Sequence, residues 1–377
     1  MSARDELPLL LRPAGGGLYT VSSGRASQLA LQRALYDALD AEEVESAWRT
    51  SLAAVGSARV AILGVPSDAG AGLVRGASYG PLALRAALLA ADPEFRSFAA
   101  REGVVDVGDV AVIPHLLHDE MVSERQKAAC RAALYPSLPP AEAAALPVSP
   151  LSIAERVVGH LYALNPELRI LLIGGDHSVT WPLVAALGRH RGDRPWAIVH
   201  PDAHTDLLPE RLGVKHCFAT WAYHANDVLG RGGRLLQVGI RASRHDRRHW
   251  ESTLGVRQIW ADEIRARGEG AVLEEIVAHL RGLGVHAVYL SNDIDATDAN
   301  LAPSTGAAEP GGLSGEFVLA LVERLGREFS LLGADLVEVA PPIGSAEDSR
   351  RTVQLGASYL AASLRALVAS PVEGRAS

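Results

Sequence analysis

Three clusters of acidic residues and histidines follow short apolar runs in this chain of 377 residues. The clusters are Gly174-Gly175-Asp176-His177-Ser178, Asp202-Ala203-His204-Thr205-Asp206 and Asp293-Ile294-Asp295. Apolar runs of about four to eight residues, separated by helical segments, are typical of buried strands in a parallel sheet. Because the carboxyl ends of such strands share one edge of the sheet, we expect the three clusters to meet there.

Short β-branched runs alternate with helical patterns along the rest of the chain, which predicts an α/β fold with one mostly parallel sheet of about eight strands. The predicted strands span residues 60–65, 104–107, 170–173, 197–200, 235–240, 256–260, 287–290 and 331–339. The predicted helices between them include residues 152–164, 272–283, 315–325 and 351–367.

The clusters have the composition of a metal site. Residues two apart on a strand project to the same side, so Asp202 can share a target with His204, and Asp293 with Asp295. Asp206 requires the loop to curl back, and the paired glycines before His177 permit a tight turn. Several carboxylates in one place repel one another, and one or two divalent cations remove that repulsion. Oxygen ligands with a minority of imidazole favour Mn²⁺, although Fe, Ni, Co and Zn also accept this mixture. Such ions are suited to hydrolysis.

These motifs together resemble those of the ureohydrolases, the family of arginase and agmatinase. Ser291 to Asp298 resembles the family pattern Ser-x-Asp-x-Asp-x-x-Asp, and Asp335 to Pro341 resembles Asp-x-Val-Glu-Val-x-Pro. Gly64-Val65-Pro66 and Arg75-Gly76-Ala77 resemble the first strand and loop of the family. The likeness covers roughly residues 58 to 365 and is strongest with the agmatinase-like branch.

The resemblance implies a three-layer α/β/α fold with a mostly parallel, eight-stranded sheet, and two Mn²⁺ ions per subunit. It assigns the first ion to His177, Asp202, Asp206 and Asp293, and the second to Asp202, His204, Asp293 and Asp295. Glu338 matches the acid that holds the guanidinium. His216, ten residues after Asp206, matches the loop histidine that moves a proton in agmatinases. Ni²⁺ is an alternative, since His and carboxylate ligands accept both metals.

The implied reaction is attack of metal-bound hydroxide on a guanidino carbon, which releases urea and an amine. Leu208 stands where arginases carry an asparagine for the substrate carboxylate, which argues against arginine as substrate. The run Cys217–Trp221 offers no charged anchor for a substrate tail, which favours a small, uncharged or unusual guanidino compound. Cys217 also follows His216 where relatives carry glycine. Hydrolysis of a formimidoyl or other linear amidine group, and a non-catalytic metal-binding relative, remain alternatives.

Whole-chain properties agree with a cytoplasmic enzyme. The formal charge is −8 with no dense basic stripe, so nucleic acid is not an expected partner, and no run is long and apolar enough for a membrane span. Residues 1–57 are expected to form a helical extension, and residues 58–370 the catalytic domain, with a proline-rich insertion around residues 110–150. The resemblance further implies a homo-oligomer, a trimer or a hexamer.

Overall fold

A nine-stranded sheet forms the centre of the protein in the computed structural model, which describes residues 1–18 and 24–371. All neighbouring strands of this sheet are parallel except the first pair. In spatial order the strands are β1 (Leu11–Arg12), β3 (Val104–Val110), β2 (Val60–Val65), β4 (Arg169–Gly174), β9 (Ser330–Val337), β8 (Ala287–Asp293), β5 (Ala197–Pro201), β6 (Leu235–Ile240) and β7 (Arg257–Trp260).

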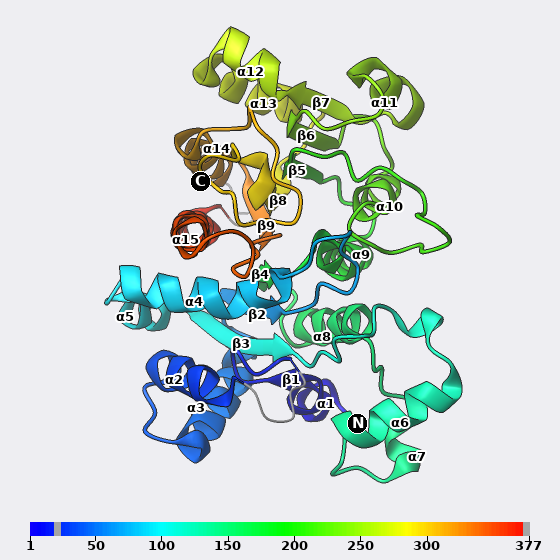
Figure 1. Cartoon of the computed structure of the whole chain (residues 1–377), viewed down its shortest axis with the longest axis vertical. Coiled ribbons are helices and arrows are strands. Elements are labelled where there is room, and N and C mark those ends of the chain that lie inside the picture. The colour runs from blue at the N-terminus through cyan, green and yellow to red at the C-terminus, as the bar shows by residue number, and fades with distance from the viewer. Residues whose placement is uncertain (19–23, 372–377) are drawn as a thin grey trace.

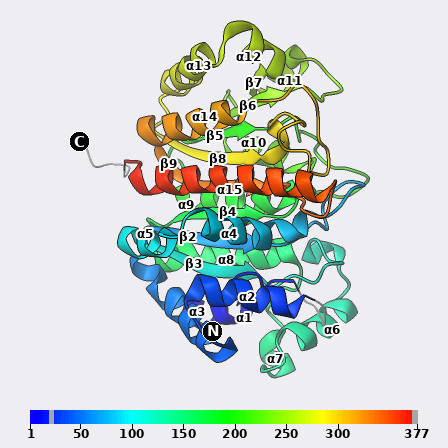
Figure 2. The same ribbon diagram turned by 60° about the vertical axis from the view of Figure 1, so that its left-hand side comes forward.

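Helices cover both faces of the sheet (Figure 1), which confirms the predicted α/β architecture. One face carries α2 (Arg25–Tyr36), α4 (Gly80–Ala91), α5 (Phe95–Glu102), α12 (Ala261–Arg267), α13 (Glu269–Gly282), α14 (Gly315–Glu328) and α15 (Ala346–Ala369). The other carries α1 (Ala3–Leu10), α3 (Ala41–Ala54), α6 (Glu124–Leu134), α7 (Pro140–Ala143), α8 (Pro150–Leu164), α9 (Thr180–Arg191), α10 (Trp221–Val228) and α11 (Arg247–Leu254). The long helix α15 crosses the sheet face beside α4 and α14 (Figure 2).

Successive side chains of each strand point to opposite faces of the sheet, which divides the core into two apolar clusters. In β4, Ile170 and Leu172 belong to the cluster under α8 and α9, whereas Leu171 and Ile173 belong to the cluster under α14 and α15. All four side chains are buried, as expected for a central strand that is covered on both faces. This explains why the strand is an unbroken apolar run rather than an alternating one.

The ninth strand, β1, comes from the N-terminal segment and pairs antiparallel with β3, so the expected count of eight strands was one too low. Its two residues are too few to show a strand pattern in the sequence. Leu7 and Leu10 of α1, and Trp48 of α3, are buried in the same cluster as α8. The segment therefore shares the core of the larger domain. Residues 19–23 of the expected extension lie outside the described residues.

A buried arginine ties these layers together. Arg85 on α4 donates through Nε to Asp106 Oδ2 (2.8 Å) and through Nη1 to Asp109 Oδ1 (2.6 Å), and its side chain is only 2 % exposed. The second oxygen of Asp109 accepts from the backbone N–H of Gly15 at 2.7 Å. One charge cluster thus links α4, β3 and the N-terminal segment. A buried pair of this kind is costly to break, because the remaining charge is left without a partner.

Replacing Arg85 by leucine is expected to lower the free energy of unfolding by about 3 to 5 kcal/mol, since the buried Asp109 and the half-buried Asp106 both lose the arginine that pairs with them. Urea denaturation of the variant measures this loss. Arg327→Leu is the matched control, because Arg327 is exposed and, among residues 1–18 and 24–371, forms an ion pair only with Glu323 on its own helix. A loss below about 1 kcal/mol for Arg85→Leu would show that the cluster is not a stabilising centre.

Candidate metal centre

The predicted metal residues meet at the carboxyl ends of four adjacent strands, β4, β9, β8 and β5. A cavity of about 170 Å³ opens there. Seven of its lining residues are those singled out from the sequence: His177, Asp202, His204, Asp206, Asp293, Asp295 and Glu338. Strands β4 and β5 are separated by β8 and β9, so the cavity lies at a point where consecutive strands diverge, the usual place for a site in such sheets.

A close approach of Gly175 to a neighbouring loop places His177 in the site. The turn at Gly175 passes so close to the preceding loop that a Cβ there would lie 1.8 Å from the backbone oxygen of Ser67. That same oxygen accepts from the N–H of Asp176 at 2.9 Å. A short 3-10 turn, His177–Val179, follows and points the imidazole of His177 across the strand ends. Gly175 is therefore needed for a close backbone approach, whereas the paired glycines were expected to permit a tight turn.

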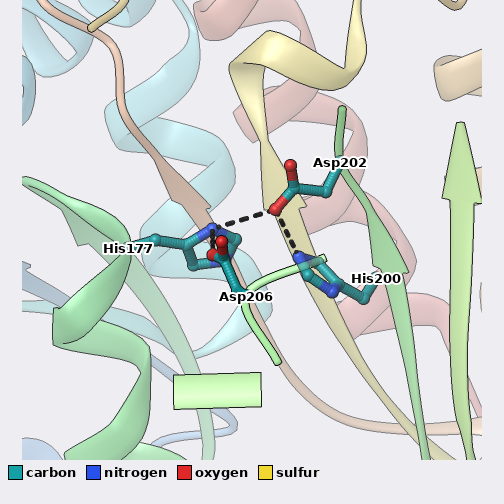
Figure 3. A group of neighbouring side chains, drawn as sticks. All are labelled: His177, His200, Asp202 and Asp206. Atoms are coloured by element: carbon teal, nitrogen blue, oxygen red, sulfur yellow. Dashed lines mark hydrogen bonds and ion pairs between the residues drawn. The ribbon is translucent and has the colours of Figure 1, made fainter. Parts of the chain in front are cut away.

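The imidazole of His177 faces three carboxylates at once. Its Nδ1 lies 2.9 Å from Asp293 Oδ2 and 3.4 Å from an Oδ2 of both Asp202 and Asp206. His177, Asp202 and Asp206 point toward one another in Figure 3. This nitrogen is buried and makes no geometrically acceptable hydrogen bond within the described residues. Its surroundings are those of a ligand atom.

Hydrogen bonding on the far side of the ring shows which nitrogen of His177 carries the proton. Asp335 accepts from the hydroxyls of Thr180 and Tyr289, so it acts as an acceptor. Ser291 Oγ lies 3.0 Å from Asp335 and donates to it, and therefore accepts from His177 Nε2, also at 3.0 Å. Nδ1 is then the nitrogen with the lone pair, and it faces three acidic side chains. Only a proton or a metal ion between them makes that arrangement favourable.

A second group of ligand atoms adjoins the first. His204 Nδ1 lies 3.0 Å from Asp295 Oδ2 and 3.6 Å from Asp202 Oδ1. Asp202 thus contacts His177 with one oxygen and His204 with the other. A carboxylate so placed can bridge two ions. Both expected pairs, Asp202 with His204 and Asp293 with Asp295, line the same cavity. The expected strand geometry is wrong, however, because β5 ends before Asp202 and Asp295 lies in a 3-10 turn.

Asp206 reaches the group through a bend in its own backbone. Its φ is +52°, in the left-handed region where aspartate is one of the better-tolerated residues. Its Oδ2 accepts from the indole N–H of Trp221 at 3.0 Å, and Trp221 also stacks on His177 with ring centroids 4.6 Å apart. Trp221 therefore holds both side chains, a contact that spacing alone could not show.

Burial makes two of the clustered carboxylates, Asp206 and Asp293, hard to ionise. Burial first, and then the neighbouring Asp202, raise the pKa of Asp206 well above its usual range. Burial and then Asp295 do the same to the pKa of Asp293. Within the described residues no lysine or arginine forms an ion pair with any of these aspartates. Their donor set, two imidazoles and four carboxylates, fits one or two divalent cations that would supply the missing positive charge.

A buried chain of side chains orients Asp202 from behind. Trp260 Nε1 donates to Gln258 Oε1 (3.0 Å), and an indole N–H can only donate. The amide of Gln258 therefore donates to Gln237 Oε1 (2.8 Å), and the amide of Gln237 donates to His200 Nδ1 (3.0 Å). His200 consequently carries its proton on Nε2 and donates it to Asp202 Oδ2 at 2.7 Å.

This row of hydrogen-bonded side chains follows the register of the sheet. His200 pairs with Gln237 across β5 and β6, and Gln237 pairs with Gln258 across β6 and β7. His200 is close enough to Asp202 and Asp206 to count geometrically as a metal ligand (Figure 3). Its Nε2 is committed to Asp202, however, so we assign it a positioning role. His200 was not among the residues expected from the sequence, although buried polar residues inside three neighbouring strands are a signal that could have found it.

Glu338 lies at the end of β9, on the wall of the same cavity. Its φ of +61° is unusual for a glutamate, and its Oε1 accepts from the backbone N–H of His177 at 2.9 Å. Burial and the nearby Asp293 raise the pKa of its carboxyl well above the usual range. A cationic group of a substrate in this cavity would restore the charged form.

The comparison with protein families agrees with this geometry. The family model of the arginase family matches residues 58–364, most of the chain. The chain belongs to the arginase family. A relative from Thermus thermophilus, N(1)-aminopropylagmatine ureohydrolase, is 36% identical over 286 residues, 75% of this chain and 83% of its own. A guanidinobutyrase from Pseudomonas aeruginosa is 30% identical over 310 residues, 80% of this chain and 83% of its own.

The chain is therefore a ureohydrolase of the agmatinase-like branch, as its motifs indicated. A solved structure, formimidoylglutamase from Bacillus subtilis, has a TM-score of 0.65 and 19% identity. The match covers 98% of this chain and 99% of the formimidoylglutamase chain, so the shared arginase fold extends into the N-terminal segment. In the part of the chain that the structure describes, no helix is sufficiently long and apolar to span a membrane.

His216, the histidine that matches the agmatinase loop, does not line the cavity of this family member. It is buried and stacks on Trp181 with centroids 5.1 Å apart. The rings of His224 and His118 lie 5.0 Å and 5.4 Å away. Lys215-His216-Cys217 thus turns the imidazole away from the metal residues. Its role as a proton carrier stays a prediction.

Burial, and then His224, His118 and Lys215, lower the pKa of His216 to about 3. An unfolded chain binds a proton on this histidine below a pH of about 6.5, whereas the folded chain does so only near pH 3. Stability must therefore fall as the pH drops from about 6.5 toward 3.

His216→Phe, which keeps the stack on Trp181, is expected to remove this part of the acid sensitivity. The free energy of unfolding should then decrease between pH 7.5 and pH 5 by about 1 to 2 kcal/mol less than in the unaltered protein. Urea denaturation at the two pH values measures the difference. An unchanged pH dependence would show that His216 titrates normally in the folded protein.

Proposed function

We propose that this ureohydrolase cleaves a C–N bond of a guanidino group by hydrolysis, releasing urea and an amine, at a pair of divalent metal ions. The observation that carries the proposal is the position of His177 Nδ1, which faces Asp202, Asp206 and Asp293 and makes no hydrogen bond within the described residues. That arrangement is unfavourable without a cation. The cavity beside it also holds Glu338, which suits a planar cationic substrate.

His177, Asp206, Asp202 and Asp293 would hold one ion, and His204, Asp295, Asp202 and Asp293 the other. Mn²⁺ fits this mixture of oxygen and imidazole ligands, and Ni²⁺ is the alternative. When bound, the ions would lower the pKa of a coordinated water and stabilise negative charge that develops on the reacting carbon's substituents. Asp202 and Asp293 would bridge the two ions.

The side chains of the cavity perform the remaining tasks. Glu338 presents a carboxylate to the substrate, and a carboxylate can accept two parallel N–H bonds from a guanidinium. Its contact with the His177 backbone fixes the direction of one oxygen. The guanidinium would thereby lie with its plane set against the metal residues. Asp206, held by Trp221, is an acid within the cavity that could hold a proton during the reaction.

The deciding experiment is urea release by the purified protein, reconstituted separately with Mn²⁺ and with Ni²⁺. The panel comprises agmatine, 4-guanidinobutanoate, 3-guanidinopropanoate, arginine and free guanidine. Urea from at least one compound other than arginine is expected. Two bound metals per chain without urea from any compound would contradict the proposal, and would favour a formimidoyl substrate or a non-catalytic relative.

Asp202→Asn and Asp293→Asn are each expected to lower urea release by at least about 100-fold and to reduce metal content, because each residue would bridge both ions. Metal analysis after dialysis and a urea assay measure the two effects. Asn retains the size of Asp, so the fold should persist and can be checked by circular dichroism. Near-normal activity in either variant would rule out the proposed metal arrangement.

Gln237→Met tests the row of hydrogen-bonded side chains that leads through His200 to Asp202. The variant keeps the length of the side chain but removes the amide that fixes the tautomer of His200. Metal affinity of the folded protein, measured by calorimetry, is expected to fall by roughly 10- to 100-fold. Gln354→Met, at an exposed position on α15, is the control. Equal affinity in both variants would show that the chain does not position Asp202.

A further inference from the structure

The metal cavity opens into a second cavity whose walls carry the opposite charge. This outer cavity has a volume of about 470 Å³ and shares Arg211 and Phe218 with the inner one. Its charged and titratable side chains are Arg75, Arg211 and His115, together with the thiol of Cys217, and none of its lining residues is acidic. The residues that complete it come partly from the insertion around residues 110–150.

Arg211 lies on the border between the two cavities. It begins a two-residue hairpin in which Arg211 and Val214 exchange backbone hydrogen bonds of 2.9 Å. The two central residues have positive φ, +52° at Leu212 and +79° at Gly213, as in the tightest hairpin turns. These two backbone hydrogen bonds fix the backbone of Arg211 and thus the position from which its side chain extends.

The guanidinium of Arg211 rests on an aromatic ring. Its Cζ lies 5.0 Å from the ring centroid of Phe218. Phe218 in turn donates its backbone N–H to Gly70 at 3.2 Å, and its ring packs beside Gly72. No carboxylate within the described residues forms an ion pair with Arg211. Its charge is thus held in place by a cation–π contact and is left available to a ligand.

Apolar groups share the wall of the inner cavity with its acidic residues and with this cation. They are Leu73, Val74, Phe218 and Ala307. The site therefore presents an acidic end, an apolar wall and a cationic mouth. A molecule that complements this order has a planar cation at one end, a short aliphatic spacer and an anion at the other end.

We propose that Arg211 binds the tail of the substrate, and that the substrate is a guanidino compound with a carboxylate at the far end of a short aliphatic chain. The inference rests on the proposed function and names the substrate class within it. A carboxylate can accept two N–H bonds from the guanidinium of Arg211. An amine tail would instead place two cations together, which disfavours agmatine. An uncharged compound was expected because the run Cys217–Trp221 contains no such anchor, but Arg211 lies before that run and lines both cavities.

The test compares substrates that share the guanidino group and differ in the tail. The KM values for 4-guanidinobutanoate, 3-guanidinopropanoate and agmatine are measured with the metal-loaded protein and with Arg211→Gln. Arg211→Gln is expected to raise KM for the better acid roughly tenfold and to change kcat less than about twofold, since the tail lies far from the reacting bond. The KM for agmatine should stay equal or decrease.

Arg211→Lys and Arg211→Glu sharpen the comparison. Lysine keeps the charge but loses the fork of donors, so KM for the acid should rise by an intermediate factor. Glutamate should reverse the preference in favour of agmatine. Arg327→Gln, an exposed arginine on α14, controls for the loss of a surface charge and should leave all KM values unchanged. Equal effects of Arg211→Gln on acid and amine, or no effect, would overturn the inference.

Failure of the proposed function would be seen separately. If urea is released only from agmatine, hydrolysis stands and the anionic tail is wrong. If no guanidino compound reacts but N-formimidoylglutamate does, urea formation is wrong, and a higher KM for that diacid in Arg211→Gln still supports the tail site. If nothing reacts, calorimetry with 4-guanidinobutanoate decides: binding that weakens roughly tenfold in Arg211→Gln supports the inference, and unchanged or absent binding overturns it.

Discussion

The centre of this protein depends on a concentration of negative charge that it cannot hold alone. Four aspartates and a glutamate share one cavity with two imidazoles, and Nδ1 of His177 faces three of the aspartates. Neighbouring groups restrain nearly every member: Trp221 holds Asp206, Ser291 holds His177 and His200 holds Asp202. These contacts fix the acids in place despite their repulsion, which is the preorganisation that a metal centre needs.

Much of this centre could be predicted from the sequence, because its ligands lie directly after strands. The four strand ends and the residues on them follow from apolar runs and from motifs, and six predicted ligands and Glu338 line one cavity. The ninth strand could not be predicted, since a two-residue strand such as Leu11–Arg12 has no periodicity. Its pairing depends on Asp109, Gly15 and Arg85, which are brought together only by the tertiary fold.

The positions of loop side chains were also beyond the sequence. His216 has the spacing of a catalytic histidine, yet stacking on Trp181 and the neighbouring imidazoles draw it away from the cavity. No sequence pattern marked Arg211 as a binding residue. Its position between the two cavities depends on a hairpin with positive φ at Leu212 and on the ring of Phe218. Spacing along a loop does not determine direction when side-chain packing decides it.

The order of the strands has a consequence for how the chain becomes a protein. Strand β9 (Ser330–Val337) is the last to be made, yet it lies between β4 and β8 in the middle of the sheet. A growing polypeptide that ends before residue 330 has two separate half-sheets, each with an unpaired inner edge. Such edges invite wrong pairing, and joining them requires contacts between distant parts of the chain, which slows folding. The protein can close its sheet only after residues 330–337 have been made.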